Sequence, residues 1–452
     1  MKSYVGKLLV LAGSSLLALN LQLHAQTSFT PAASYAVGTN PVLVVAADVD
    51  GDGRKDLICL SGITNLLTVL TNNGSGFGSN TTVKAGNTGF FANSFTAADV
   101  NGDGKLDLVC ALSTGYPNYA GRLLVFTNAG GVFVSNVTVV VGTNPVSVAS
   151  ADVNGDGKVD LISANTGALP NYHTLSIMTN NGSGGFGSNA VANVGSGVQC
   201  VIAADVNGDG KVDLVTANFY DSTLTILTNN GSGRFTLASS PGVGSNPLLV
   251  VAADVNGDGK LDLISANSGN DTLSILTNNG SGKFTLSSSP GVGFTPYAVT
   301  AADVNGDGWV DLISANKDGN SLTVLTNNGS GGFAIAISPT VGSKPYSVAV
   351  ADLSGDGRLD LIVANTGTNI LTVLTNALTF LPKLTLKKSS NGVIMSWPSQ
   401  WTGWTGWALQ QNTNLNDTNW TSVSGTIGDD GTTKTITNSS PSGNLYFRLA
   451  HP

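Results

Sequence analysis

Aspartate recurs along this chain in a nine-residue pattern, Asp-x-Asn-Gly-Asp-Gly-x-x-Asp. Side-chain oxygens stand at positions 1, 3, 5 and 9, and glycine at position 6 permits the unusual backbone angle of a sharp turn. Calcium takes roughly six to eight oxygen ligands, many of them carboxylates, from such turned loops. The pattern therefore predicts a calcium loop in which position 7 adds its backbone carbonyl oxygen.

The pattern occurs seven times, and successive first aspartates are 49 to 53 residues apart. Turn formation alone explains the glycines, but it does not explain an Asp at position 9 of every repeat. An EF-hand would need Glu at position 12, and this chain contains no Glu. The predicted ligands are Asp48, Asp50, Asp52, Asp56, Asp99, Asn101, Asp103, Asp107, Asp152, Asn154, Asp156, Asp160, Asp205, Asn207, Asp209, Asp213, Asp254, Asn256, Asp258, Asp262, Asp303, Asn305, Asp307, Asp311, Asp352, Ser354, Asp356 and Asp360.

These loops predict up to seven bound calcium ions. The first loop has an additional carboxylate, Asp50, whereas the seventh has Ser354 at position 3. Because carboxylates are stronger calcium ligands than a hydroxyl group, we expect the tightest site in the first repeat and the weakest in the seventh.

Each repeat reads as four short strands around its Asp loop. In the fifth repeat the strands are expected at residues 247–253, 263–266, 272–277 and 284–289, with an Asn-Gly turn between the last two. A repeat of about 50 residues with four strands is the size of one β-propeller blade. Radial packing buries both faces of each blade, so the sequence predicts an all-β, seven-bladed β-propeller.

The two ends of the repeat region fit together as one blade. The seventh repeat stops near Asn376 without a fourth strand. The segment from Ser28 to Pro41 aligns without gaps to the fourth strand of the fourth repeat, from Arg234 to Pro247. We therefore expect residues 27–37 to close blade seven and the propeller to span residues 26–378. Pro31 fits because proline is tolerated on an edge strand.

Two further segments flank the propeller. Residues 1–25 have Lys2 and Lys7 before an apolar stretch, which is typical of a cleaved secretory signal peptide. No later segment is apolar enough to span a membrane. Residues 379–452 contain about six short strands separated by turns, which predicts a small β-sandwich. Trp401, Trp404 and Trp407 in this module are interpreted either as a sugar-binding platform or as loop and core residues.

The Asp loops and their flanking strands resemble the FG-GAP/VCBS repeat family, whose propellers are similar to the N-terminal head of integrin α-subunits. The Phe-Gly pair of the family name is present as Phe77-Gly78 and Phe186-Gly187, and the resemblance covers about residues 27–378. It implies calcium on one face of the propeller and ligands on the opposite face. The C-terminal module is similar, more loosely, to fibronectin-III and immunoglobulin-like modules.

Loops that depart from the repeat are candidates for ligand contacts, because function concentrates in irregular loops on rigid scaffolds. Such loops occur in repeats two to four and are rich in tyrosine, a residue common at recognition sites. The predicted ligand-binding residues are Tyr116, Tyr119, Tyr172, His173, Tyr220 and Asp221. The alternative is that these side chains only pack against one another.

Composition narrows the range of functions. The net charge is −8 and the 20 basic residues are scattered, so we expect no nucleic-acid partner. There is no Glu, and most of the 28 aspartates belong to the loops, so we do not expect an enzyme. The predicted function is a secreted or cell-surface, monomeric, calcium-dependent adhesion or ligand-binding protein with an extracellular protein or glycan partner. A lectin-like propeller, a polysaccharide lyase and a purely structural envelope protein are the alternatives.

Overall fold

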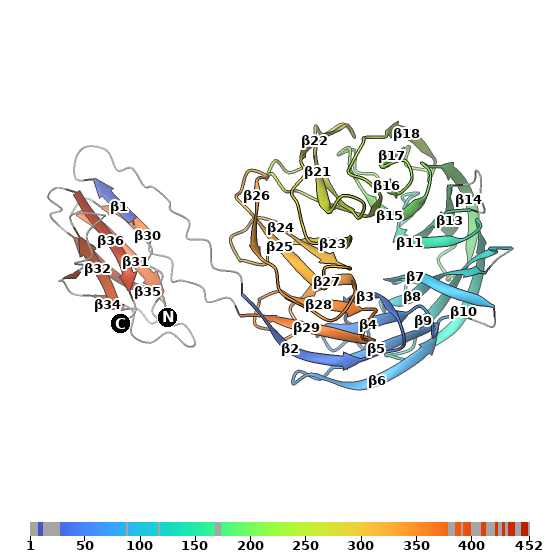
Figure 1. Ribbon diagram of the computed structural model, residues 1–452, viewed down its shortest axis with the longest axis horizontal. Coiled ribbons are helices and arrows are strands. Elements are labelled where there is room, and N and C mark those ends of the chain that lie inside the picture. Colours follow the sequence, from blue (N-terminus) through green and yellow to red (C-terminus); the bar gives the residue numbers. More distant parts are fainter. Residues whose placement is uncertain are drawn as a thin grey trace. The chain divides into compact units, whose positions relative to one another are not determined.

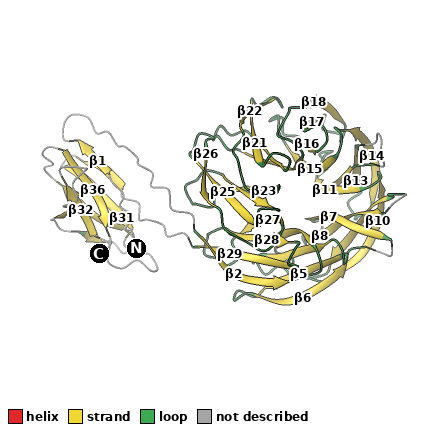
Figure 2. Cartoon of the chain, viewed as in Figure 1, coloured by secondary structure: helices red, strands yellow, loops and turns green. Residues whose placement is uncertain are grey.

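The computed structural model of the chain consists of two compact units, Gln26–Leu378 and Met1–Ala25 with Thr379–Pro452. All regular elements in the described part of the chain are β-strands (Figure 2). Since the described part contains no helix, no membrane-spanning helix is found there. The structure describes residues 8–11, 28–86, 89–115, 118–167, 173–377, 385–389, 392–398, 408–412, 421–423, 427–429, 433–438 and 444–450.

The larger unit is a seven-bladed β-propeller, as the sequence predicts, and every blade is a four-stranded antiparallel sheet (Figure 1). We call the strands of a blade A to D, from the central axis outward. In this order the blades are β3 (Pro41–Ala47), β4 (Asp56–Ser61), β5 (Leu66–Asn72) and β6 (Phe77–Lys84); β7 (Phe90–Ala98), β8 (Asp107–Thr114), β9 (Gly121–Asn128) and β10 (Phe133–Val141); β11 (Pro145–Ala151), β12 (Asp160–Asn165), β13 (Thr174–Asn180) and β14 (Phe186–Asn193); β15 (Val198–Ala204), β16 (Asp213–Asn218), β17 (Thr223–Asn229) and β18 (Phe235–Ser239); β19 (Pro247–Ala253), β20 (Asp262–Asn267), β21 (Thr272–Asn278) and β22 (Phe284–Ser288); β23 (Pro296–Ala302), β24 (Asp311–Asn316), β25 (Ser321–Asn327) and β26 (Phe333–Ile337); and β27 (Pro345–Ala351), β28 (Asp360–Asn365), β29 (Ile370–Asn376) and β2 (Phe29–Ala36).

Blade seven combines the two ends of the repeat region. Strand β2 pairs with β29, with Phe29 opposite Asn376 and Ala36 opposite Ile370, which is the position that the sequence alignment gives it. The register shifts between Pro31 and Ala33, so the proline lies at an irregularity of an edge strand, where it is tolerated. Strand β2 therefore joins the first residues of the ring to its last blade.

The hydrophobic core lies between neighbouring blades. Strands B and C carry the fully buried aliphatic side chains; Ile264 and Ile275 of blade five, for example, share one cluster with Leu312 of blade six. The same kind of cluster joins Leu57 of blade one to Ile362 of blade seven, so the ring also closes through apolar packing. Each blade thus buries two faces that a single sheet would leave in water.

The smaller unit contains two four-stranded sheets, as expected for the predicted sandwich. One has the order β30, β31, β35, β34 and the other β1, β36, β32, β33. Strand β1 lies inside the predicted signal peptide, so its pairing with β36 belongs to the uncleaved chain. Trp401, Trp404 and Trp407 lie outside the described residues. The strands are β1 (Leu8–Leu11), β30 (Thr385–Ser389), β31 (Gly392–Pro398), β32 (Ala408–Asn412), β33 (Thr421–Ser422), β34 (Gly428–Asp429), β35 (Thr433–Asn438) and β36 (Asn444–Ala450).

A buried asparagine ends strand B in blades three to seven, and its side chain joins strands B and C. In blade four, Asn218 Nδ2 donates to Thr225 Oγ1 at 2.8 Å, and the Thr216 hydroxyl donates to Asn218 Oδ1 at 2.9 Å. Ser163, Ser265 and Ser314 supply the same hydroxyl in blades three, five and six. Blade seven has Val363 at this position, and the buried Asn365 Oδ1 has no hydrogen-bond donor among the described residues.

The missing hydrogen-bond donor in blade seven predicts how one added hydroxyl group changes the stability of the protein. Val363→Thr should raise the free energy of unfolding by about 1 kcal/mol, because an unsatisfied buried carbonyl oxygen gains the donor that blade four already has. The reverse change in blade four, Thr216→Val, should lower it by about 1–3 kcal/mol by leaving Asn218 Oδ1 without a donor. Denaturant unfolding of both variants measures the two values, and a loss of stability of equal size in both would contradict this explanation.

Candidate calcium loops and ligand-binding face

All seven Asp loops lie on one face of the propeller. Each loop follows strand A and ends at the first residue of strand B, for example between β19 and β20, so the direction of strand A places every loop on the same side. We call this side the loop face. The opposite side, where strand A begins and strand B ends, is the pocket face.

Within each loop the side-chain oxygens accept hydrogen bonds from the turned backbone. In blade five, Asp254 accepts the N–H groups of Gly257 at 2.7 Å and Gly259 at 2.8 Å, and Asn256 Oδ1 accepts that of Asp258 at 2.9 Å. Gly257 and Gly259 have φ values of 76° and 81°, a conformation that favours glycine. A carboxylate oxygen has two acceptor sites, so these bonds orient the carboxylate and still leave lone pairs for a cation.

The position-9 carboxylates are buried; none is more than 3% exposed. Burial raises the pKa of all seven, and that of Asp311 reaches about 7, although two backbone hydrogen bonds lower it and two neighbouring loop carboxylates raise it further. A buried carboxylate beside other carboxylates is costly without a compensating cation. The donor set therefore fits a divalent cation that prefers oxygen ligands.

The first loop gathers its carboxylates most closely. One carboxylate oxygen each from Asp48, Asp50 and Asp56 lies within 4.8 Å of the others. In the seventh loop, by contrast, the Ser354 hydroxyl points to Asp352 Oδ1 at 3.5 Å. The geometry agrees with the expected order of affinities, which stays a prediction.

The sixth loop has a tryptophan, Trp309, at position 7. Its indole lies between Gly257 of the fifth loop and Gly329 of the next turn; a Cβ atom on Gly329 would lie 2.7 Å from Trp309 Cε2, and one on Gly257 would also clash. This side chain therefore bridges blades five and six. Its bulk also helps to explain why burial raises the pKa of Asp311 to about 7.

A belt of asparagines connects the loops of neighbouring blades. Each is the last residue of strand C, and its backbone N–H donates to the position-9 carboxylate of its own blade, as Asn278 does to Asp262 Oδ1 at 2.8 Å. Its side-chain Nδ2 donates to the carbonyl oxygen of position 2 in the preceding blade, which for Asn278 is that of Val206 at 2.7 Å. The belt consists of Asn72, Asn128, Asn180, Asn229, Asn278, Asn327 and Asn376, with Asn72 bonded to Leu353 of blade seven.

The sequence interpretation missed this belt. It treated Asn278-Asn279-Gly280 as a turn, although the first of the two asparagines recurs in every repeat. The Thr-Asn pair that recurs at the end of the third strand of every repeat was the available signal for the belt.

On the pocket face, the predicted ligand-binding residues are only partly assembled. His173 and Asp221 both contact Ser196. His173 Nε2 lies 3.3 Å from Ser196 Oγ, and Asp221 Oδ2 accepts the Ser196 N–H at 2.7 Å. Tyr220 is 65% exposed and contacts Phe219 edge-to-face at 5.2 Å. These residues of blades three and four form a single surface.

The remaining predicted residues do not add to that surface in the described part of the chain. Tyr119 lies in the loop before β9, with a φ of 45°, and its carbonyl oxygen accepts the N–H of Asn144. Tyr116 and Tyr172 lie outside the described residues.

The contact between Ser196 and His173 lacks the third group of a hydrolytic triad. Such a triad needs a carboxylate on the other imidazole nitrogen, which holds the base in the correct tautomer. Here the Asp221 carboxylate binds the Ser196 backbone, and His173 Nδ1 has no partner among the described residues. The described residues therefore form no Ser-His-Asp triad at this contact.

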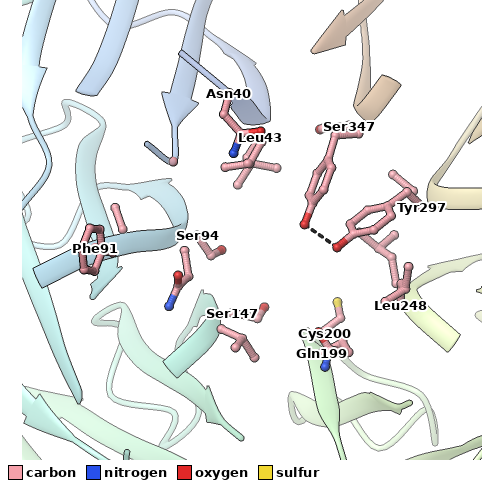
Figure 3. A pocket seen from close by; sticks show the side chains of 18 of the residues that line it. Asn40, Leu43, Phe91, Ser94, Ser147, Gln199, Cys200, Leu248, Tyr297 and Ser347 are labelled. Atoms are coloured by element: carbon pink, nitrogen blue, oxygen red, sulfur yellow. Dashed lines mark hydrogen bonds between the residues drawn. The ribbon is translucent and has the colours of Figure 1, made fainter. Parts of the chain in front are cut away.

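A pocket of about 410 Å³ lies at the centre of the pocket face (Figure 3). It is lined by the first residues of all seven A strands, including Leu43, Ser94, Ser147, Gln199 and Tyr297. The sequence interpretation missed it, because it searched the inserted loops and not the strands. A signal was present in the tyrosines that follow the strand-A prolines of blades six and seven, Tyr297 and Tyr346.

Fold and loops together define a seven-bladed propeller of Asp-loop repeats. The FG-GAP-like repeat matches residues 48–110, 152–216, 205–265, 254–314 and 303–363. The chain belongs to the FG-GAP-like repeat family. No curated protein sequence matches it.

Solved structures with the same fold are distant in sequence. BBS1N, in a crystal structure of its complex with ARL6DN, is 12% identical, with a TM-score of 0.56 over 78% of this chain and 98% of that chain. The periplasmic gluconolactonase PpgL of Pseudomonas aeruginosa is 15% identical, with a TM-score of 0.52 over 74% of this chain and 91% of that chain. At these identities the similarity shows the fold alone.

The asparagine belt predicts that removal of a single side-chain amide group lowers the stability of the protein markedly. Asn278→Ala should lower the free energy of unfolding by about 1–3 kcal/mol, because it leaves the buried carbonyl oxygens of Val206 and Leu261 without a donor. The exposed neighbour Asn279 is the matched control, and Asn279→Ala should change stability much less. Equal losses in the two variants, measured by denaturant unfolding, would show that the belt does not contribute to stability.

Proposed function

We propose that this protein is secreted, binds calcium in its seven Asp loops, and binds an extracellular protein or glycan on its pocket face. The apolar N-terminal segment supports secretion, and the buried position-9 carboxylates support calcium binding. The observation that carries ligand binding is the pocket at the centre of the face opposite the loops. Exposed apolar side chains on the same face, Ile63 at 67%, Tyr220 at 65% and Phe294 at 69%, extend the contact area.

The two faces have different roles in this proposal. Calcium neutralises the loop carboxylates and holds each A–B turn in one conformation, whereas the pocket face contacts the ligand. A binding role is favoured over catalysis because the described pocket lining contains no carboxylate, histidine or lysine that could transfer a proton.

Calcium should stabilise the protein strongly. Each occupied site adds about 2.7 kcal/mol to the free energy of unfolding when free calcium exceeds the dissociation constant a hundredfold, because the metal binds only the folded loop. Thermal unfolding in calcium and in excess chelator measures this, and an unchanged melting temperature would overturn calcium binding. Ser354→Asn, which gives blade seven the side chain of blades two to six, should tighten the weakest site in a calorimetric titration.

Trp309 offers a spectroscopic control for the same prediction. Terbium replaces calcium in oxygen sites, and an adjacent indole sensitises its luminescence. Trp309→Lys, which introduces the residue found at this position in blades two to five, should abolish most of the sensitised emission and leave the calcium-dependent melting shift in place. If the emission persists when excess calcium is added, terbium does not occupy these loops.

The ligand class can be found with glycan and extracellular-protein arrays, probed with the mature chain in calcium and in chelator. Binding in calcium that is lost in chelator is the expected result, since the loops hold the propeller together. Sugar hits would favour the lectin-like alternative and protein hits an adhesin. Binding to neither would leave a structural role and overturn the ligand-binding proposal.

A further inference from the structure

The pocket on the pocket face has a distinctive chemical lining. None of its lining residues is charged, although the chain carries a net charge of −8. Apolar side chains such as Val42, Leu43 and Leu248 line it from different blades, and amide and hydroxyl groups complete the lining. Figure 3 shows Gln199, Ser147 and Tyr297 around the same opening, each from a different blade. The lining therefore lacks the carboxylates that would repel an anion.

Two tyrosines from neighbouring blades form the polar wall. The rings of Tyr297 and Tyr346 have centroids 3.7 Å apart and planes inclined by 37°, and their hydroxyl groups are hydrogen-bonded to each other. Because only one proton lies between the two oxygens, the accepting hydroxyl keeps its own O–H to donate elsewhere. Burial raises the pKa of both hydroxyls, so both stay protonated at neutral pH.

A cation lies beside these rings. Lys317 Nζ is 4.6 Å from the centroid of Tyr297 and 5.2 Å from that of Tyr346. Lys317 belongs to the loop between strands B and C of blade six, and it is half-buried. Attraction to the two rings holds the ammonium group beside the tyrosine pair.

Two acidic side chains of blades five and six, Asp271 and Asp318, both accept hydrogen bonds from Thr295, in the loop between β22 and β23. Asp271 Oδ1 accepts the N–H of Thr295 at 2.8 Å, and Asp318 Oδ2 accepts its hydroxyl at 2.8 Å. Ser347, beside Tyr346, accepts the N–H of Val44 at 3.3 Å, which leaves the serine O–H as a further donor. Hydroxyl donors thus predominate on this wall of the pocket, and the Lys317 ammonium group, which is not itself a lining group, lies against the tyrosine rings that form the wall.

We propose that the pocket binds a small hydroxylated carboxylate, such as a sugar acid, with the carboxylate held by Lys317 and the hydroxyls of Tyr297 and Tyr346. A pocket of about 410 Å³ is within the size range of small-molecule sites. An ammonium group and phenolic O–H donors suit an anion, and the amide groups suit the hydroxyls of the ligand. This assignment rests on the proposed ligand-binding function of the pocket face and names its ligand chemistry.

The test compares three sugars of similar size and different charge: glucuronate, glucose and glucosamine. Isothermal titration of the calcium-loaded chain should give glucuronate at least tenfold tighter binding than glucose, since a charge-assisted contact is worth about tenfold or more in affinity. Glucosamine should bind most weakly, because its ammonium group faces that of Lys317.

Variants assign the preference to named groups. Lys317→Met should remove the preference for glucuronate over glucose, and Tyr346→Phe should weaken glucuronate binding severalfold while keeping the ring. Lys344→Met changes an exposed lysine in the loop that enters blade seven and should have no effect. Thermal unfolding checks that each variant is folded.

The inference is overturned if none of the sugars binds, if glucose binds as tightly as glucuronate, or if Lys317→Met keeps the preference. The ligand-binding function is judged separately. An array ligand that binds the Lys317→Met variant as tightly as the unaltered chain would support that function and still remove the carboxylate site.

Discussion

The rest of this structure depends on a buried carboxylate that joins three pieces of chain. The position-9 aspartate begins strand B, accepts an N–H from its own loop, and accepts another from the end of strand C; in Asp262 these donors are Val255 and Asn278. The asparagine then reaches the preceding blade through its amide group. Burying a charge in this way is costly unless hydrogen bonds and a cation compensate it, so loop conformation, blade packing and the proposed metal binding depend on one side chain.

This arrangement separates the constraints on the two faces. On the loop face, seven repeats of the same carboxylate and amide contacts leave little freedom in sequence. On the pocket face, the corresponding positions differ from blade to blade, from Val42 to Gln199 to Tyr346. A ring held together on one side can tolerate such variation on the other, and variation among symmetry-related positions is what a ligand-specific site requires.

Periodic features could be predicted from the sequence because each is repeated. The seven loops, the four-strand blades and the closing strand β2 all follow from spacing and local pattern. The tyrosine pair could not be predicted in the same way: Tyr297 and Tyr346 are 49 residues apart, and their contact exists only because adjacent A strands converge on the axis. The asparagine belt was missed for the opposite reason, since Asn278 has a sufficient local explanation as a turn residue and its role is visible only between blades.

The two faces are also related through charge. Most of the 28 aspartates lie in the loops, and seven divalent cations would add fourteen positive charges to a chain with a formal net charge of −8. Calcium loading would thus reverse the sign of the net charge without changing any residue of the pocket. A long-range field of this kind acts on the approach of a charged ligand. It follows that an anionic ligand and calcium should assist each other even though they occupy opposite faces, and that this assistance should weaken as salt screens the field.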